Sequence, residues 1–148
     1  MKKKIMVCTM LLCTLFLTGC LKKTKISVSS FEEILKEEGY TIETIDKDFM
    51  TKDTKNILSA ISKDGYSINY IEYYDDDAAK DFFNETYDKY ENSCNIKTET
   101  NGTNYNTFKC DTGEEYIAIT RVENTVVYAL TTKNNKDDVK ETLKKLKY

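Results

Sequence analysis

Apolar and polar positions change their period several times along the chain, and each period predicts a helix or a strand. Ser30 and Glu33 have the spacing of a capping box, and Gly39 supplies a natural helix stop. Together they predict a short helix over residues 31–38. Residues 41–45 then alternate between polar and apolar side chains, as a strand with one buried face does.

Two further runs, residues 57–62 and 66–74, have the composition of strands. They flank Asp64-Gly65, which is one of the strongest signals for a two-residue hairpin turn. Such a turn would place Ile61 opposite Ile68 in the ladder. We therefore predict an antiparallel hairpin in the first half of the chain.

A second helix is predicted over residues 77–91, because apolar side chains from Ala78 to Tyr90 follow one helical stripe. Three aspartates at positions 75–77 open it, and carboxylates at a helix N-terminus interact favourably with the helix dipole. Their oxygens also suit a hard cation such as calcium. No spaced calcium-loop pattern follows them, so the sequence favours a cap.

Residues 94–132 are predicted to form four strands in a meander. Turns are expected at residues 101–103, 112–113 and 123–124. These turns align one apolar row across all four strands, and we expect it to lie in the core. The row consists of Ile96, Phe108, Ile117 and Leu130. A slip of one residue at any turn would move part of the row to the other face.

A last helix is predicted over residues 137–148, with Val139 and Leu146 on its apolar stripe. We expect it to cover the apolar row, on the same face of the sheet as the helix over 77–91. Helices on one face of an antiparallel sheet define a two-layer α+β domain. The sequence thus predicts a single α+β domain over residues 30–148, with the four-strand meander in its C-terminal half.

Composition limits the classes of function. The chain has 148 residues, of which 32% are charged and 40% hydrophobic, as expected of one globular domain. It has no histidine, which removes histidine-based triads and histidine-ligated metal sites. Nucleophile motifs and glycine-rich phosphate loops are also missing. We therefore expect no enzyme activity, no metal and no cofactor, with a carboxylate-dependent hydrolase as the weakest alternative.

The first twenty residues have three parts. Lys2 to Lys4 form a positive start, and Ile5 to Leu17 is an uncharged, mostly apolar run of 13 residues. A helix needs about 20 such residues to cross a bilayer, so this run suits a secretory signal instead. The run ends in Leu17-Thr18-Gly19-Cys20, which resembles the lipobox of bacterial lipoproteins.

The resemblance implies that a diacylglycerol is attached to Cys20 and that residues 1–19 are removed as a signal peptide. The mature chain would lie on the outer face of the cytoplasmic membrane, with residues 20–29 as its lipidated cysteine and short basic tether. The alternative is an uncleaved N-terminal anchor with an incidental cysteine. The whole chain resembles small lipoproteins of Gram-positive-type bacteria, and its element order is similar to that of the TATA-binding-protein-like repeat.

Loss of the signal peptide would also change the charge balance. The complete chain has 22 basic and 25 acidic residues and a net charge of −3. Without the first three lysines, 19 basic and 25 acidic residues give −6. Nucleic acid is disfavoured as a partner for a chain of that sign.

Cys94 and Cys110 are the thiols that remain after Cys20 in the mature chain. The predicted register places them opposite each other on neighbouring strands, and the compartment permits oxidation, so we expect a disulfide. A redox or metal pair is disfavoured, because there is no C-x-x-C and no third soft ligand. Two buried free thiols are the other alternative.

The sheet face turned away from the predicted helices carries tyrosines at its sides and small apolar residues between them. Its members are Tyr105, Tyr116, Ala118, Val127 and Ala129. A shallow apolar floor of this kind accepts a partner or is an ordinary solvated face. With eleven tyrosines in the chain, core roles for tyrosine are the simpler interpretation. We expect a non-catalytic binding or accessory module for an envelope or membrane protein or a peptide. The alternative is a solute or envelope-polymer binder that uses this face.

Overall fold

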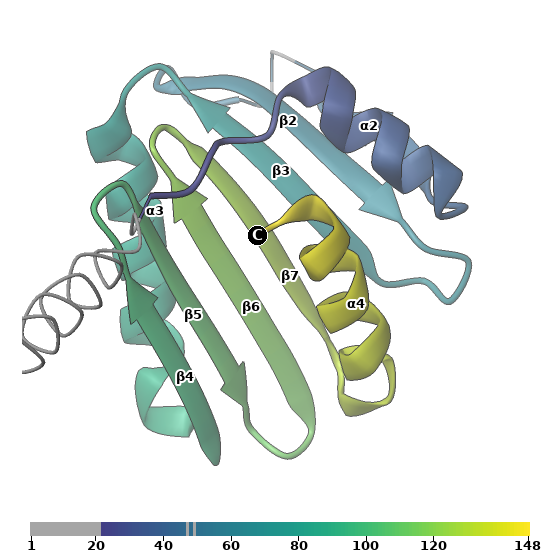
Figure 1. The fold of residues 1–148 in the computed structure, drawn as a ribbon, viewed down its shortest axis with the longest axis vertical. Helices are drawn as coiled ribbons and strands as arrows, with labels where there is room; N and C mark the ends of the chain where they lie inside the picture. Colours follow the sequence, from purple (N-terminus) through teal and green to yellow (C-terminus); the bar gives the residue numbers. More distant parts are fainter. Residues whose placement is uncertain (1–21, 47, 49) are drawn as a thin grey trace, which may run out of the picture.

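The computed structural model describes residues 22–46, 48 and 50–148, so the predicted signal peptide and Cys20 lie outside the described residues. A seven-stranded antiparallel sheet forms its centre, in the order β1-β2-β3-β7-β6-β5-β4 (Figure 1). Its strands are β1 (Thr41–Thr44), β2 (Thr54–Ile61), β3 (Ser67–Tyr73), β4 (Ile96–Asn101), β5 (Tyr105–Asp111), β6 (Glu115–Val122) and β7 (Thr125–Thr132). The helices that pack against it are α2 (Val28–Glu37), α3 (Asp76–Tyr90) and α4 (Lys136–Leu146). The α+β class is thereby confirmed.

Two meanders share this sheet. The first contains β1, β2 and β3, after which α3 carries the chain across the sheet to its far edge. There β4 begins the second meander, which returns inward until β7 pairs with β3 (Figure 1). The last strand therefore lies in the middle of the sheet and joins the two meanders.

Helices cover both faces of the sheet (Figure 1). On one face, α3 packs against Phe108, Ile117 and Ile119. On the other, α2 and α4 pack against Ala118 and Ala129. The structure corrects the expectation that the helices share one face. Because neighbouring residues of β6 are apolar on both sides, each face of the sheet needs its own cover.

Polar side chains set where the helices begin. The Ser27 hydroxyl accepts a hydrogen bond from the N–H of Ser30 at 3.1 Å, so α2 starts three residues before the predicted position. The Asp75 carboxylate accepts from the N–H of Ala78 at 2.8 Å. This bond confirms the expected cap role for Asp75, and Asp76 and Asp77 lie in the first turn of α3.

Two of the four predicted strand registers keep their side chains on the expected faces. Ile117 pairs with Leu130 across β6 and β7, as the two-residue turn between these strands predicts. Phe108 pairs with Ile119 rather than Ile117, because the turn between β5 and β6 falls at residues 113–114, one position later than predicted. A register shift of two preserves the face. Phe108 and Ile117 are accordingly fully buried, as expected of the apolar row.

The other two registers are shifted by an odd number of residues, which reverses the faces. Ile96 pairs with Asp111 and is 63% exposed, so it does not belong to the core row. Ala60, not Ile61, pairs with Ile68. Both errors come from loop length. The β4–β5 turn has two residues where three were expected, and the β2–β3 turn has three where two were expected.

Tyrosines fill much of the interior. The buried ones are Tyr40, Tyr66, Tyr70, Tyr73, Tyr105, Tyr116 and Tyr148. Their hydroxyls are mostly paired. The Tyr40 hydroxyl lies 2.8 Å from that of Tyr66, and the Tyr148 hydroxyl lies 2.7 Å from that of Thr125. These residues have the core role that the sequence favoured.

Alkaline pH is expected to destabilise the domain through its tyrosines. Burial, with smaller effects from nearby carboxylates, raises the pKa of Tyr73 and Tyr116 to about 12. The pKa in an unfolded chain is about 10. Between these values the unfolded chain releases phenol protons that the folded domain keeps, so the free energy of unfolding falls as pH rises. Denaturant titrations followed by tyrosinate absorbance test this, and an unchanged midpoint across the window would contradict it.

Candidate functional site

The sheet face that was predicted to bind a partner lies inside the protein. Each of its residues is at most 8% exposed: Tyr105, Tyr116, Ala118, Val127 and Ala129. Most of the face lies in one core cluster with α2 and α4. The Lys23 ammonium lies 5.3 Å from the centre of the Tyr105 ring. The predicted binding face is therefore wrong, because its small apolar residues pack against α2 and α4 and do not face solvent.

One member of this face has an unusual environment. The Tyr116 hydroxyl is buried and has no hydrogen-bond partner in the part of the chain that the structure describes. The ammonium groups of Lys136 and Lys140 each lie 5.7 Å from the centre of its ring, within cation–π distance. The Tyr116 ring thus contributes to the packing, whereas its buried, unpaired hydroxyl lowers the free energy of unfolding.

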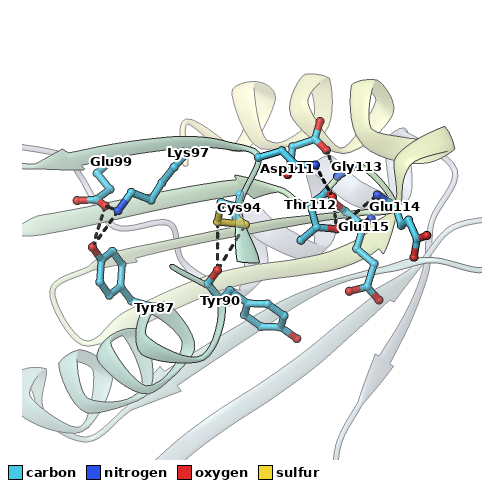
Figure 2. The surroundings of a disulfide bond; sticks show 12 residues. Tyr87, Tyr90, Cys94, Lys97, Glu99, Asp111, Thr112, Gly113, Glu114 and Glu115 are labelled. Atoms are coloured by element: carbon cyan, nitrogen blue, oxygen red, sulfur yellow. Dashed lines mark hydrogen bonds and ion pairs between the residues drawn. A yellow bond between two sulfur atoms is a disulfide. The ribbon is translucent and has the colours of Figure 1, made fainter. Parts of the chain in front are cut away.

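Cys94 and Cys110 form a disulfide with their Cα atoms 5.3 Å apart (Figure 2). The predicted pair is bridged, but the reason given by the register is wrong. Cys94 precedes β4, and the residue that pairs with Cys110 is Lys97. The carbonyl oxygen of Tyr90 lies 3.2 Å from Sγ of Cys94 and 3.8 Å from Sγ of Cys110. The bridge joins the segment after α3 to β5 and so fixes where the edge strand β4 begins.

A small polar cleft of about 260 Å³ lies between α3 and the edge of the sheet. Its lining includes Tyr87, Glu99, Asn101 and Asn106. The Tyr87 hydroxyl donates to Glu99 at 2.9 Å, and Figure 2 shows that Lys97 approaches the same carboxylate. Asn106 donates to Asn101 at 2.7 Å. Because these groups bond to one another, the cleft has few free donors or acceptors for a polar solute.

A larger cavity of about 390 Å³ lies between the end of α2, the β2–β3 turn and α4. The Lys145 ammonium lies 2.5 Å from the Glu38 carboxylate there. The Tyr40 hydroxyl lies between those of Tyr66 and Thr142, at 2.8 and 3.1 Å. These bonds join α2, the first meander and α4, so we interpret the polar groups of this cavity as structural.

The amino-terminal segment of the described chain, residues 22–27, is bound to the domain. The side-chain amide of Asn104 holds both main-chain groups of Lys23: the N–H donates to Oδ1 at 3.0 Å, and the carbonyl accepts from Nδ2 at 2.8 Å. Farther on, the N–H of Ile26 donates to the Tyr148 hydroxyl at 3.1 Å. The predicted tether over residues 20–29 is thus corrected, because from Lys23 onwards it belongs to the folded domain.

An open cleft of about 450 Å³ lies beside this segment, where α4 approaches β5. We call it the lysine cleft, and its lining is Lys23, Lys109, Lys140, Lys144, Lys147 and Tyr148. On α4, Lys140 and Lys144 lie four residues apart and so on one side of the helix, and Lys147 follows as its C-cap with a left-handed backbone. Lys109 belongs to β5 and Lys23 to the amino-terminal segment. Three separate parts of the chain therefore bring five ammonium groups together.

The lysine cleft is electrostatically unbalanced. Among the residues that the structure describes, Lys140 is the one lining lysine with a carboxylate within ion-pair distance, that of Asp137 at 3.6 Å. Burial and the charge of Lys109 lower the pKa of Lys23. Burial and the charge of Lys140 lower the pKa of Lys109. These like charges are held near one another and are partly desolvated, which favours the binding of an anion.

Sequence reasoning missed this cleft, although half of its signal is visible. Lysines at 140, 144 and 147 mark one side of the last predicted helix. The other half depends on tertiary structure, because Lys109 and Lys23 reach the same place only through the sheet register and the docked segment.

In residues 22–46, 48 and 50–148, no group of three or more Cys, Asp or Glu side chains is arranged to hold a metal ion. No helix within these same ranges is long and apolar enough to cross a membrane.

The chain matches no protein-family model, and no curated protein matches it. Among solved structures, it has a likeness to a GTP binding regulator from Thermotoga maritima. The two chains are 15% identical, with a TM-score of 0.49, and the match covers 82% of this chain and 84% of that chain. No argument about function follows from a similarity at this level.

Replacement of Tyr116 by Phe is expected to raise the free energy of unfolding by about 1 kcal/mol, because it removes a buried hydroxyl that lacks a partner. Tyr148→Phe is the matched control, since that hydroxyl lies 2.7 Å from Thr125 and accepts from Ile26. The control should lower stability by about 1 kcal/mol. Denaturant unfolding measures both, and a loss of stability in Tyr116→Phe would contradict the assignment.

The double substitution Cys94→Ala with Cys110→Ala is expected to lower stability by about 3 kcal/mol, the chain-entropy value for a loop of this length. Unfolding under non-reducing conditions measures the loss. Addition of a reductant should lower the stability of the wild-type protein and leave that of the variant unchanged. Equal stability of the two oxidised proteins would show that the bridge does not stabilise the fold.

Proposed function

We propose that the protein is a lipid-anchored, non-catalytic binding module on the outer face of the cytoplasmic membrane. The observation that carries this proposal is the order of a lysine-led start, an apolar run and the lipobox-like Leu17-Thr18-Gly19-Cys20. The anchor is an acylated Cys20, and the partner is another envelope or membrane protein or a peptide.

The docked amino-terminal segment supports a position close to the membrane. Lys23, which is bound to Asn104, lies three residues after Cys20. Three extended residues span at most about 11 Å. A domain attached in this way stays beside the headgroup layer, so its partner is membrane-bound or lies in the adjacent envelope.

An open sheet edge supports a protein or peptide partner. All six residues of β4 are exposed, and no described strand pairs with its outer side. The main-chain N–H and C=O groups of such an edge can pair with an extended segment of another chain. Solute binding is the weaker alternative, because the polar side chains of the cleft next to α3 bond to one another.

Acylation of Cys20 is tested by metabolic labelling with a clickable fatty acid and by intact mass. The wild-type protein should carry the label and lack its first nineteen residues. Cys20→Ala should lose the label and keep those residues, because the acylated thiol is the substrate of the cleavage. Cys13→Ala, which changes a cysteine of the apolar run, is the control and should behave like the wild type. Equal labelling of Cys20→Ala and the wild type would exclude the proposal.

A further inference from the structure

The lysine cleft concentrates positive charge in a chain that is acidic overall. Five ammonium groups line it, whereas the net charge of the chain is −3. Four of them, those of Lys23, Lys109, Lys144 and Lys147, have no carboxylate within ion-pair distance among the described residues. Like charges near one another repel, so an anion in the cleft would relieve this repulsion and add its own attraction.

The chemistry of the lining specifies the kind of anion. Ammonium groups donate hydrogen bonds and accept none, so the ligand must present acceptor oxygens. Lysine is a compact point charge that suits phosphate oxygens. The cleft has a volume of about 450 Å³ and is open, which leaves room for several phosphate groups side by side. Its lysines come from three parts of the chain, as a broad contact with many phosphates requires.

The position of the cleft specifies the source of the phosphate. Lys23 lines the cleft and lies three residues after Cys20. An acyl chain on Cys20 would hold the start of the segment at the lipid interface, within about 11 Å of Lys23. The headgroups of the membrane are then the nearest phosphates.

We propose that the lysine cleft binds the phosphate headgroups of anionic phospholipids and is a second contact with the membrane beside the anchor. This inference rests on the proposed function for the position of the anchor. It also gives the domain a defined orientation. Because α3 covers the opposite face of the sheet, the contact directs the side with α4 and β5 towards the bilayer and α3 away from it.

A single tryptophan can report this orientation, because the chain contains none. Thr98→Trp places the reporter opposite Lys109 in the ladder, at an exposed position of β4. Asp88→Trp, at an exposed position of α3, is the control for the other side. The full chain is extracted from membranes in detergent and placed in nanodiscs of brominated phosphatidylcholine, with or without phosphatidylglycerol.

The reporter at position 98 is expected to be quenched by brominated lipid in discs that contain phosphatidylglycerol and to be largely unquenched in phosphatidylcholine alone. The reporter at position 88 should stay unquenched in both. Removal of two charges by Lys140→Gln with Lys144→Gln should shift the orientation equilibrium about 25-fold, because one lysine near an anionic surface is worth about fivefold. Lys80→Gln with Lys89→Gln removes the same charge from α3 and should leave the quenching unchanged.

Several outcomes would overturn the proposal. Equal quenching at position 98 in both kinds of disc would show that lipid charge is irrelevant. Strong quenching at position 88 would show that α3 faces the bilayer. Loss of quenching on addition of inorganic pyrophosphate at constant ionic strength would assign the cleft to a soluble phosphate. The intact mass of the same preparation reports acylation separately, and a chain without acyl groups can still bind acidic discs. A failure of the anchor is therefore distinguishable from a failure of the cleft.

Discussion

Burial of both faces of β6 and β7 is the constraint on which the rest of the structure depends. Ile117 and Ile119 point to one side of the sheet, and the intervening Ala118 points to the other. A sheet that is apolar on both sides must be covered on both sides. The chain meets this requirement with α3 on one face and with α2, α4 and the amino-terminal segment on the other. In the part of the chain that the structure describes, both apolar faces of this sheet are therefore covered by helices or by the amino-terminal segment.

The elements could be predicted from the sequence because they depend on local patterns. Capping side chains, helical stripes and glycine turns lie within a few residues of one another, and the β6–β7 register follows from one tight turn. The faces could not be predicted as well. Ile96 was misplaced because one residue more or less in a turn reverses a face, and neighbouring turn lengths share the same glycine signals. The side on which α4 packs could not be predicted, because small residues such as Ala118 and Ala129 suit a solvated sheet face as well as one that packs against a helix.

The lysine cleft could not be predicted from the net charge of the chain. A net charge of −3 describes the whole chain and conceals five lysines around one cleft. The stripe on α4 is visible in the sequence, whereas Lys23 and Lys109 join it only through a docked segment and a sheet register. The two proposals fit together physically. If the lysine side meets the bilayer, then α3 faces away from it, and the open edge of β4 lies beside the bilayer surface, within reach of a membrane-bound partner.

The paired amide contact between Asn104 and Lys23 also has a mechanical consequence. A pull that reaches the domain from residues before Lys23 is borne first by these two hydrogen bonds, of 3.0 and 2.8 Å. It is borne only afterwards by the Lys25 ammonium, which donates to Asn124, and by the N–H of Ile26, which donates to Tyr148. Contacts loaded one after another peel apart at a lower force than contacts loaded together. Each residue that peels away adds about 3.5 Å of length while the sheet stays folded. If the chain is anchored at Cys20 as proposed, the segment would act as a short extensible linker, which lets the domain move away from its point of attachment under load and return when the load is released.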